Sequence, residues 1–133
     1  MNIVEKVKKL NFAPGEYVVI GSGLLDVLGI RQANDIDIAV LPELHARLRT
    51  TGEWEEEKRY GKIFLKKEKI EIVPQLSWSE YPTSTEEAIA SATVIDNVYF
   101  MNLQELRRFK EALGREKDFA DIALIDAYLK EYA

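Results

Sequence analysis

The sequence predicts an α/β or α+β domain, with a mixed central sheet flanked by helices and a helical hairpin at the C-terminus. Three observations indicate this class: short β-branched and aromatic runs recur along the chain, amphipathic segments separate them, and residues 102–133 show helical spacing. The chain has 133 residues and a hydrophobic fraction of 47%, without internal repeats or a long Gly/Ser linker. Because this length can bury one core, we expect a single domain over residues 1–133.

Helices are expected where apolar residues recur every three or four positions and where caps or helix breakers mark the ends. Pro42 stands at the first turn of one such segment, which Gly52 ends. Asn102 followed by Glu105 has the spacing of a capping box, and Gly114 is the natural break between the last two helices. The expected helices are residues 2–10, 22–29, 42–52 and 84–92, followed by two within residues 102–133.

Strands are expected where β-branched and aromatic residues form short runs between turn residues. The second of these runs alternates polar and apolar residues and then becomes fully apolar, as a strand does when its far end is buried. The expected strands are residues 16–21, 34–41, 53–61, 62–68 and 69–76, with one further extended segment at residues 92–101.

Composition excludes several classes of function. The formal net charge of −5 argues against non-specific binding to a nucleic-acid backbone, although it leaves room for a local basic patch. The chain has no cysteine, so disulfides and thiolate zinc sites are excluded. No apolar run approaches the roughly 20 residues of a membrane span, and the first residues lack the core of a signal peptide. We therefore expect a cytoplasmic protein that has no membrane partner.

Two aspartates interrupt an apolar run in the segment NDIDIAVL. Residues two apart in a strand point to the same face, so Asp35 and Asp37 are expected to share one face. Ile36 and Ile38 then point the other way, into the core. Two carboxylates on one face repel each other, and a divalent cation, which prefers oxygen ligands, reverses that balance. Alternatively, Asn34 and Asp35 form a turn and Asp37 is a solvated strand residue.

The preceding strand ends in Gly21, Ser22 and Gly23 and passes directly into a helix. Such a turn exposes backbone N–H groups at which a phosphate binds well. The glycines permit close approach and unusual dihedral angles, and the serine hydroxyl can donate to a phosphate oxygen. Many strand–helix turns contain two glycines for packing alone. The carboxylate pair on the next strand favours instead a triphosphate site between the turn and a bound metal.

The segment from Gly21 to Asp37 resembles the signature of the nucleotidyltransferase superfamily whose type member is DNA polymerase beta. That signature is Gly-Ser or Gly-Gly, a spacer, and then Asp-x-Asp or Asp-x-Glu; here Gly-Ser is followed by twelve residues and then Asp-Ile-Asp. The segment IRQANDIDIAV is similar to the small bacterial and archaeal branch that includes abortive-infection toxins and antibiotic nucleotidyltransferases. That branch often carries Arg-x-x-x-Asp-x-Asp, and Arg31 occupies the arginine position. The segment FKEALGREKDFADIALI also resembles its final helices.

The resemblance implies a minimal nucleotidyltransferase fold and a third acidic residue on a later strand, between apolar residues. Glu71 has this placement, between Ile70 and Ile72, although the family more often uses aspartate there. Glu71 would act as the third metal ligand or as the base. Alternatively, it is an exposed strand residue that pairs with Lys69 or Lys62.

The reaction implied by the resemblance is transfer of a nucleoside monophosphate from a nucleoside triphosphate to an acceptor, with release of pyrophosphate. The residues expected to be catalytic and to hold Mg²⁺ or Mn²⁺ are Asp35, Asp37 and Glu71. The residues expected to bind the nucleotide are Gly21, Ser22, Gly23, Arg31 and Lys117. The acceptor would be an RNA such as a tRNA end, a protein side chain or a small molecule such as an antibiotic.

The alternative is a nucleotide-binding or partner-binding module that keeps the fold and has little turnover, such as the antitoxin component of a toxin–antitoxin pair. The small size of the chain favours this alternative, because little of it remains for a dedicated acceptor-binding domain. A homodimer could supply the missing wall of the site.

Charged residues near the break between the last two helices have two interpretations. Lys110 and Arg115 could reach nucleotide phosphates, as Lys117 could. Alternatively, they are ordinary helix-surface charges, as in a pair of Arg107 with Glu111 or as solvated charges near Asp118 and Asp121.

Three further side chains have simpler expectations. His45 is the single histidine and is expected on a solvated helix surface. Trp54 is expected to pack in the core or to be partly buried. Trp78 either packs in the same way or stacks on a nucleotide base.

Overall fold

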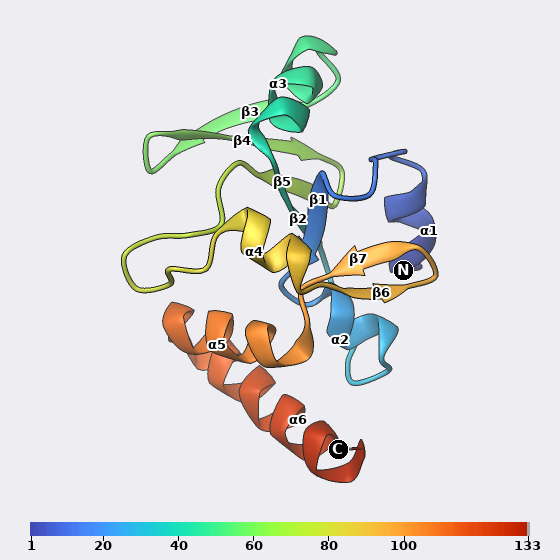
Figure 1. Cartoon of the computed structure of the whole chain (residues 1–133), viewed down its shortest axis with the longest axis vertical. Helices are drawn as coiled ribbons and strands as arrows, with labels where there is room; N and C mark the ends of the chain where they lie inside the picture. The colour runs from blue at the N-terminus through green and yellow to red at the C-terminus, as the bar shows by residue number, and fades with distance from the viewer. Residues whose placement is uncertain (133) are drawn as a thin grey trace.

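The computed structural model describes residues 1–132 and shows an α+β fold, with one seven-stranded mixed sheet and six helices (Figure 1). The predicted class and the helical C-terminus are confirmed. The helices are α1 (Ile3–Lys8), α2 (Gly23–Val27), α3 (Pro42–Thr50), α4 (Thr85–Ala90), α5 (Leu103–Leu113) and α6 (Glu116–Tyr132). The strands are β1 (Tyr17–Ile20), β2 (Ile36–Val40), β3 (Glu55–Arg59), β4 (Lys62–Lys67), β5 (Ile70–Val73), β6 (Thr93–Ile95) and β7 (Val98–Phe100).

The strand order across the sheet is β3-β4-β5-β2-β1-β7-β6. β2 is parallel to β5 and β1 is parallel to β7, whereas the other neighbouring pairs are antiparallel. The short connection through α2 brings β2 back antiparallel to β1. The longer connection through α3 and the β3–β4 hairpin returns β5 parallel to β2. β1 and β2, the strands on either side of the Gly-Ser turn and α2, therefore lie at the centre of the sheet, and β5 lies next to β2.

The central strands explain the apolar runs in the sequence. All four residues of β1 are buried, and in β2 only Asp37 is not fully buried. Trp54 is buried as predicted. His45 differs from the prediction, because its Nε2 lies 2.7 Å from the carbonyl oxygen of Ile63 and joins α3 to β4.

The extended segment predicted at residues 92–101 is in fact a hairpin of two short strands, β6 and β7. Asp96 and Asn97 form its two-residue turn, with φ of 50° and 66°. Two positive φ values are typical of the tight hairpin turns whose twist matches that of the strands, and Asp and Asn tolerate them best after glycine. The Asp-Asn pair was the sequence signal for this turn.

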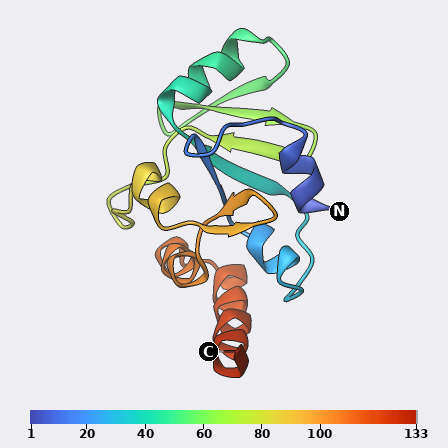
Figure 2. The same cartoon turned by 45° about the vertical axis from the view of Figure 1, so that its right-hand side comes forward.

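The C-terminal helices form the predicted hairpin. Gly114, with φ of 63°, ends α5 in the left-handed conformation. The Asn102 side chain accepts a hydrogen bond from the Glu105 N–H at 2.8 Å, but the Glu105 side chain bonds elsewhere, so only half of the predicted capping box forms. Figure 2 shows α6 extending away from the sheet, on the side opposite α3. No helix within residues 1–132 is long and apolar enough to cross a membrane.

The two edges of the sheet are β3 and β6. β3 carries the sequence EEEKR, and its first four residues are exposed. It confirms the strand predicted at residues 53–61. β6 has only three residues.

Candidate functional site

Gly21 brings the turn after β1 against the carboxylate of Asp37. The last residue of β1, Ile20, pairs with Asp37 across the antiparallel ladder. Gly21 has φ of 70°, and a Cβ atom at this position would lie 3.1 Å from Asp37 Oδ2. Both the backbone conformation and the close approach of the carboxylate therefore favour glycine at this position.

Asp37 and Glu71 lie side by side on neighbouring strands. The parallel register of β2 and β5 pairs Asp37 with Glu71, so the two carboxylates share one face of the sheet. The flanking residues Ile36 and Ile38 are fully buried on the other face, as the alternation predicted. The predicted position of Glu71 between apolar neighbours thus brings it next to the aspartate pair.

Asp35 completes the acidic group from the residue before β2. It is exposed, whereas Asp37 is partly buried. Burial, and next the negative charge of Asp35, raise the pKa of Asp37 above its ordinary value. The positive charges of Lys110, Arg59 and Lys117 oppose this shift only in part. The two aspartates are therefore held close enough to repel each other, which is the arrangement that a cation relieves.

Glu71 forms an ion pair with Arg59, the last residue of β3. The guanidinium carbon of Arg59 also lies 4.1 Å from the centroid of the Phe64 ring, and its Nε is 3.4 Å from Glu57 Oε1. The expected partners, Lys69 and Lys62, form no ion pair with Glu71 in the described residues. Arg59 was missed because nothing in the local sequence indicates that the β3–β4 hairpin returns it to β5.

The acidic residues do not form a ready three-ligand cluster. Within residues 1–132, no group of three or more His, Asp or Glu side chains is arranged to hold a metal ion. Asp35 and Asp37 remain free of ion pairs in that part of the chain, whereas Glu71 is held by Arg59. Asp35 and Asp37 are therefore the carboxylates available to a cation without breaking an ion pair.

Ser22 and Gly23 have different roles in the turn. The Ser22 hydroxyl accepts a hydrogen bond from Arg31 Nη2 at 2.5 Å. Gly23 is buried, and a Cβ atom there would lie 2.7 Å from Cγ1 of Val19. Gly23 therefore allows α2 to pack closely on β1, while Gly21 lies against the Asp37 carboxylate.

A buried ion network joins this turn to the C-terminal helices. Arg31 donates to both carboxylate oxygens of Asp121, at 2.6 and 2.7 Å, and Lys110 Nζ lies 2.8 Å from Asp121 Oδ2. Arg115 makes the same two-pronged contact with Asp118, at 2.7 and 3.1 Å. Lys110, Asp118 and Asp121 are only 3%, 1% and 4% exposed. For Lys110, Asp118 and Asp121 the interpretation as helix-surface charges is therefore wrong, whereas Arg115 is exposed and pairs with Asp118 as that interpretation expected.

Lys117 differs from its neighbours in this region. It is exposed, and in the described chain it makes no ion pair with a carboxylate. It helps to line a surface depression with Arg115, Glu116 and Ala120, and its charge acts on Asp37. Of the three basic residues singled out near the helix break, Lys117 is the one whose charge is not committed to the fold.

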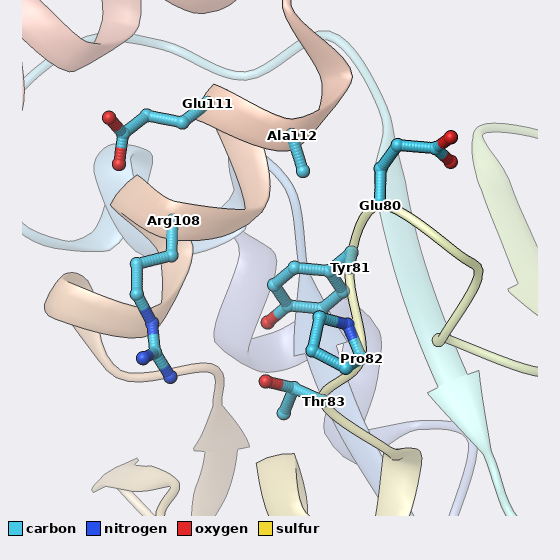
Figure 3. A pocket seen from close by; sticks show the side chains of 7 residues that line it. All are labelled: Glu80, Tyr81, Pro82, Thr83, Arg108, Glu111 and Ala112. Atoms are coloured by element: carbon cyan, nitrogen blue, oxygen red, sulfur yellow. The ribbon is translucent and has the colours of Figure 1, made fainter.

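A second depression lies away from the aspartates, between the segment before α4 and helix α5 (Figure 3). The Tyr81 and Thr83 hydroxyls both donate to Glu105, which is also paired with Arg108. The ring of Tyr81 packs against Trp78 and Phe109, with centroids 5.4 and 5.2 Å away. These contacts dock the segment onto α5, and Trp78 belongs to that packing.

The site thus brings together Gly21, Ser22, Asp35, Asp37 and Glu71 at one end of the central strands. Arg31 contacts it through Ser22, and Lys117 acts on it by charge alone. Comparison of the chain with protein-family models, with curated proteins and with solved structures finds no match. A functional proposal therefore depends on the chemistry of these residues.

Proposed function

We propose that the protein is a metal-dependent nucleotidyltransferase that moves a nucleoside monophosphate from a nucleoside triphosphate to an acceptor nucleophile and releases pyrophosphate. The observation that carries this proposal is the pairing of Asp37 with Glu71, next to a glycine that allows the Gly-Ser turn to touch the Asp37 carboxylate. A third carboxylate beside the aspartate pair is what the sequence resemblance implies. It therefore supports the specific nucleotidyltransferase fold within the α+β class.

The donor set fits a hard divalent cation such as Mg²⁺ or Mn²⁺. Asp35 and Asp37 offer only oxygen ligands, and burial, followed by the charge of Asp35, raises the pKa of Asp37, so a bound cation would favour its ionised form. Arg59 places a positive charge on Glu71, at the edge of the same acidic group. Asp35 and Asp37 would hold the ion, and Glu71 would join them when Arg59 releases it.

When bound, the ion would neutralise triphosphate charge and lower the pKa of the acceptor oxygen. The residues of the chain would do the rest by positioning. Gly21 allows the triphosphate to approach the backbone, and the Ser22 hydroxyl donates to a phosphate oxygen. Glu71 accepts the acceptor proton as the acceptor oxygen bonds to the α-phosphorus and the bond to pyrophosphate breaks. Lys117 meets the outer phosphates.

One observation favours a second candidate, a nucleotide-binding or partner-binding module with little turnover. Arg59 holds Glu71 and Arg31 holds Ser22, so two groups of the proposed machinery have internal partners. In such a module these contacts would be permanent, and the acidic face would serve recognition instead of chemistry. The difference between the two candidates is turnover.

The first experiment measures how nucleotide binding depends on metal. Calorimetric titration with each nucleoside triphosphate should give at least about tenfold tighter binding with Mg²⁺ or Mn²⁺ than with EDTA, because the ion removes repulsion between the triphosphate and the carboxylates. The same nucleotide should raise the melting temperature only when metal is present. Equal affinity with and without metal would contradict the two-aspartate cation site.

The second experiment tests Glu71 as the proton acceptor. Glu71→Gln should leave nucleotide affinity nearly unchanged, while transfer of the labelled nucleoside monophosphate falls about 10²-fold, the usual loss when an acid–base group is removed. Glu57→Gln is the matched control, because Glu57 lies beside the same arginine but not beside Asp37. A binding module predicts no transfer in the wild type. Robust transfer that Glu71→Gln leaves unchanged would assign the proton to another residue.

A further inference from the structure

We propose that Asp121 is a positioning residue for this site. Acting through Arg31, it fixes the Ser22 hydroxyl so that the hydroxyl proton points toward the bound nucleotide. The inference rests on the proposed function and changes one expectation, since it makes Arg31 a support for Ser22 instead of a direct phosphate ligand.

The hydrogen bonds of Arg31 show that its guanidinium is committed to the protein. Nε and Nη2 donate to the two oxygens of Asp121, Nη2 also donates to Ser22 Oγ, and Nη1 donates to the carbonyl oxygen of Gln32 at 2.8 Å. A guanidinium has five N–H groups, so about one remains for any other partner. The planar fork allows Arg31 to hold Asp121 and Ser22 at the same time.

The direction of the Ser22 proton follows from this geometry. A hydroxyl has one proton and two lone pairs. Because Arg31 can only donate, Ser22 Oγ must accept in this contact, and its proton points elsewhere. Within residues 1–132 the Ser22 side chain makes no other hydrogen bond. The Ser22 proton is therefore available to a phosphate oxygen.

Asp121 is suited to hold this arrangement because it cannot easily move. It is 4% exposed and lies 2.8 Å from Nζ of Lys110, which is itself 3% exposed. Burial would raise the pKa of Asp121, but the hydrogen bonds from Arg31 and Lys110 outweigh burial and hold the pKa below its ordinary value. Asp121 therefore stays ionised and orients Arg31. In this way helix α6 sets the donor direction of a residue 99 positions earlier in the chain.

A double-mutant cycle between Ser22 and Asp121 tests the inference. The dissociation constant of the preferred Mg²⁺–nucleotide is measured for the wild type, Ser22→Ala, Asp121→Asn and the double variant. Each single change should weaken binding about tenfold, the effect of losing one hydrogen bond to a charged group. The double variant should also be weakened about tenfold, because Asp121 acts only through Ser22.

Asp126→Asn is the matched control. Asp126 makes the same two-pronged contact with an arginine, Arg107, at 2.7 and 3.0 Å, but it lies on the outer side of the helical hairpin. The nucleotide affinity of the Asp126→Asn variant should equal that of the wild type. Arg31→Lys is a second route if Asp121→Asn does not fold, because lysine keeps the charge and cannot bridge both partners. It should also weaken binding about tenfold and show no further loss with Ser22→Ala.

The outcomes separate the two proposals. A double variant weakened about a hundredfold, or a control weakened as much as Asp121→Asn, overturns the positioning role and leaves the proposed function standing. A wild-type protein that binds no nucleoside triphosphate overturns both. Non-additive loss with an unaffected control supports the positioning role whether or not transfer occurs.

Discussion

Replacing Asp35 and Asp37 together with asparagine is expected to reduce nucleotide transfer by about 10³-fold or more, because the cation would lose both of its first ligands and with them several kcal/mol of charge stabilisation. The folded protein should be as stable as the wild type or slightly more stable. The two carboxylates repel each other, and asparagine keeps their shape without their charge. Thermal unfolding and a transfer assay on the same preparation measure both effects.

The pH dependence of this stability difference has a definite sign. The pKa of Asp37 is raised in the folded state, so the folded protein binds this proton more tightly than the unfolded chain does. The contribution of Asp37 to the stability of the folded protein is fully present below the ordinary aspartate pKa of 3.8. It is lost as the pH rises through the pKa of Asp37 in the folded state. The advantage of the double variant should therefore be largest near neutral pH and should shrink as the pH is lowered.

Glu55→Gln with Glu57→Gln is the matched control for the aspartate pair. It removes the same number of negative charges from exposed residues two apart on β3. Transfer and stability should both stay close to those of the wild type. If the aspartate variant instead unfolds several degrees below the wild type, the pair has a structural role and the solvated-turn interpretation gains support.

Replacing Lys110 with methionine is expected to lower the free energy of unfolding by about 3 kcal/mol, since removing one member of a buried ion group leaves its partners without full compensation. Lys110 Nζ lies 2.8 Å from Asp121 Oδ2 and 3.9 Å from Asp118 Oδ1, and all three side chains are buried. Methionine fills a similar volume, so the loss reports charge instead of a cavity. Urea unfolding followed by circular dichroism measures it, with Lys117→Met as the exposed control.

Lowering the pH should reduce the difference in unfolding free energy between the wild type and Lys110→Met. Burial would raise the pKa values of Asp118 and Asp121, but hydrogen bonds, from Arg115 to Asp118 and from Arg31 and Lys110 to Asp121, hold both below the ordinary value. Their stabilising contribution is present above the unfolded pKa and is lost as the pH falls through the folded pKa. The wild type should therefore lose more stability in acid than Lys110→Met. A variant as stable as the wild type at neutral pH would show that Lys110 adds nothing to the net stability of the folded protein.

The sequence predicted the parts of the site that depend on local periodicity. Alternation in a strand was sufficient to place Ile36 and Ile38 in the core and Asp37 on the other face of β2. A glycine after an apolar run was sufficient to locate the turn at Gly21. Both features are local: side chains in a strand alternate between its two faces every two residues, and a glycine permits a turn directly after the strand.

The contacts between distant segments could not be predicted in this way. Arg31 and Asp121 are 90 residues apart, and their contact depends on how the C-terminal hairpin docks against the turn after β1. Burial of Asp121 was therefore missed, because its charge suggests the surface when partners are unknown. Arg59 reaches Glu71 only through the register of three neighbouring strands. Register and docking are set by the whole core and not by any short segment.

The composition of the sheet edges has a consequence for behaviour at high concentration. An edge strand with free N–H and C=O groups can recruit a strand of another molecule and begin aggregation. β3 presents only charged side chains at one edge, and β6 offers three residues at the other. Both features discourage strand addition between molecules, because charged side chains stay hydrated at the first edge and a three-residue strand offers few hydrogen bonds at the second. Concentrated preparations should resist fibril formation, and contacts between copies of the chain should involve helices instead of a continuous intermolecular sheet.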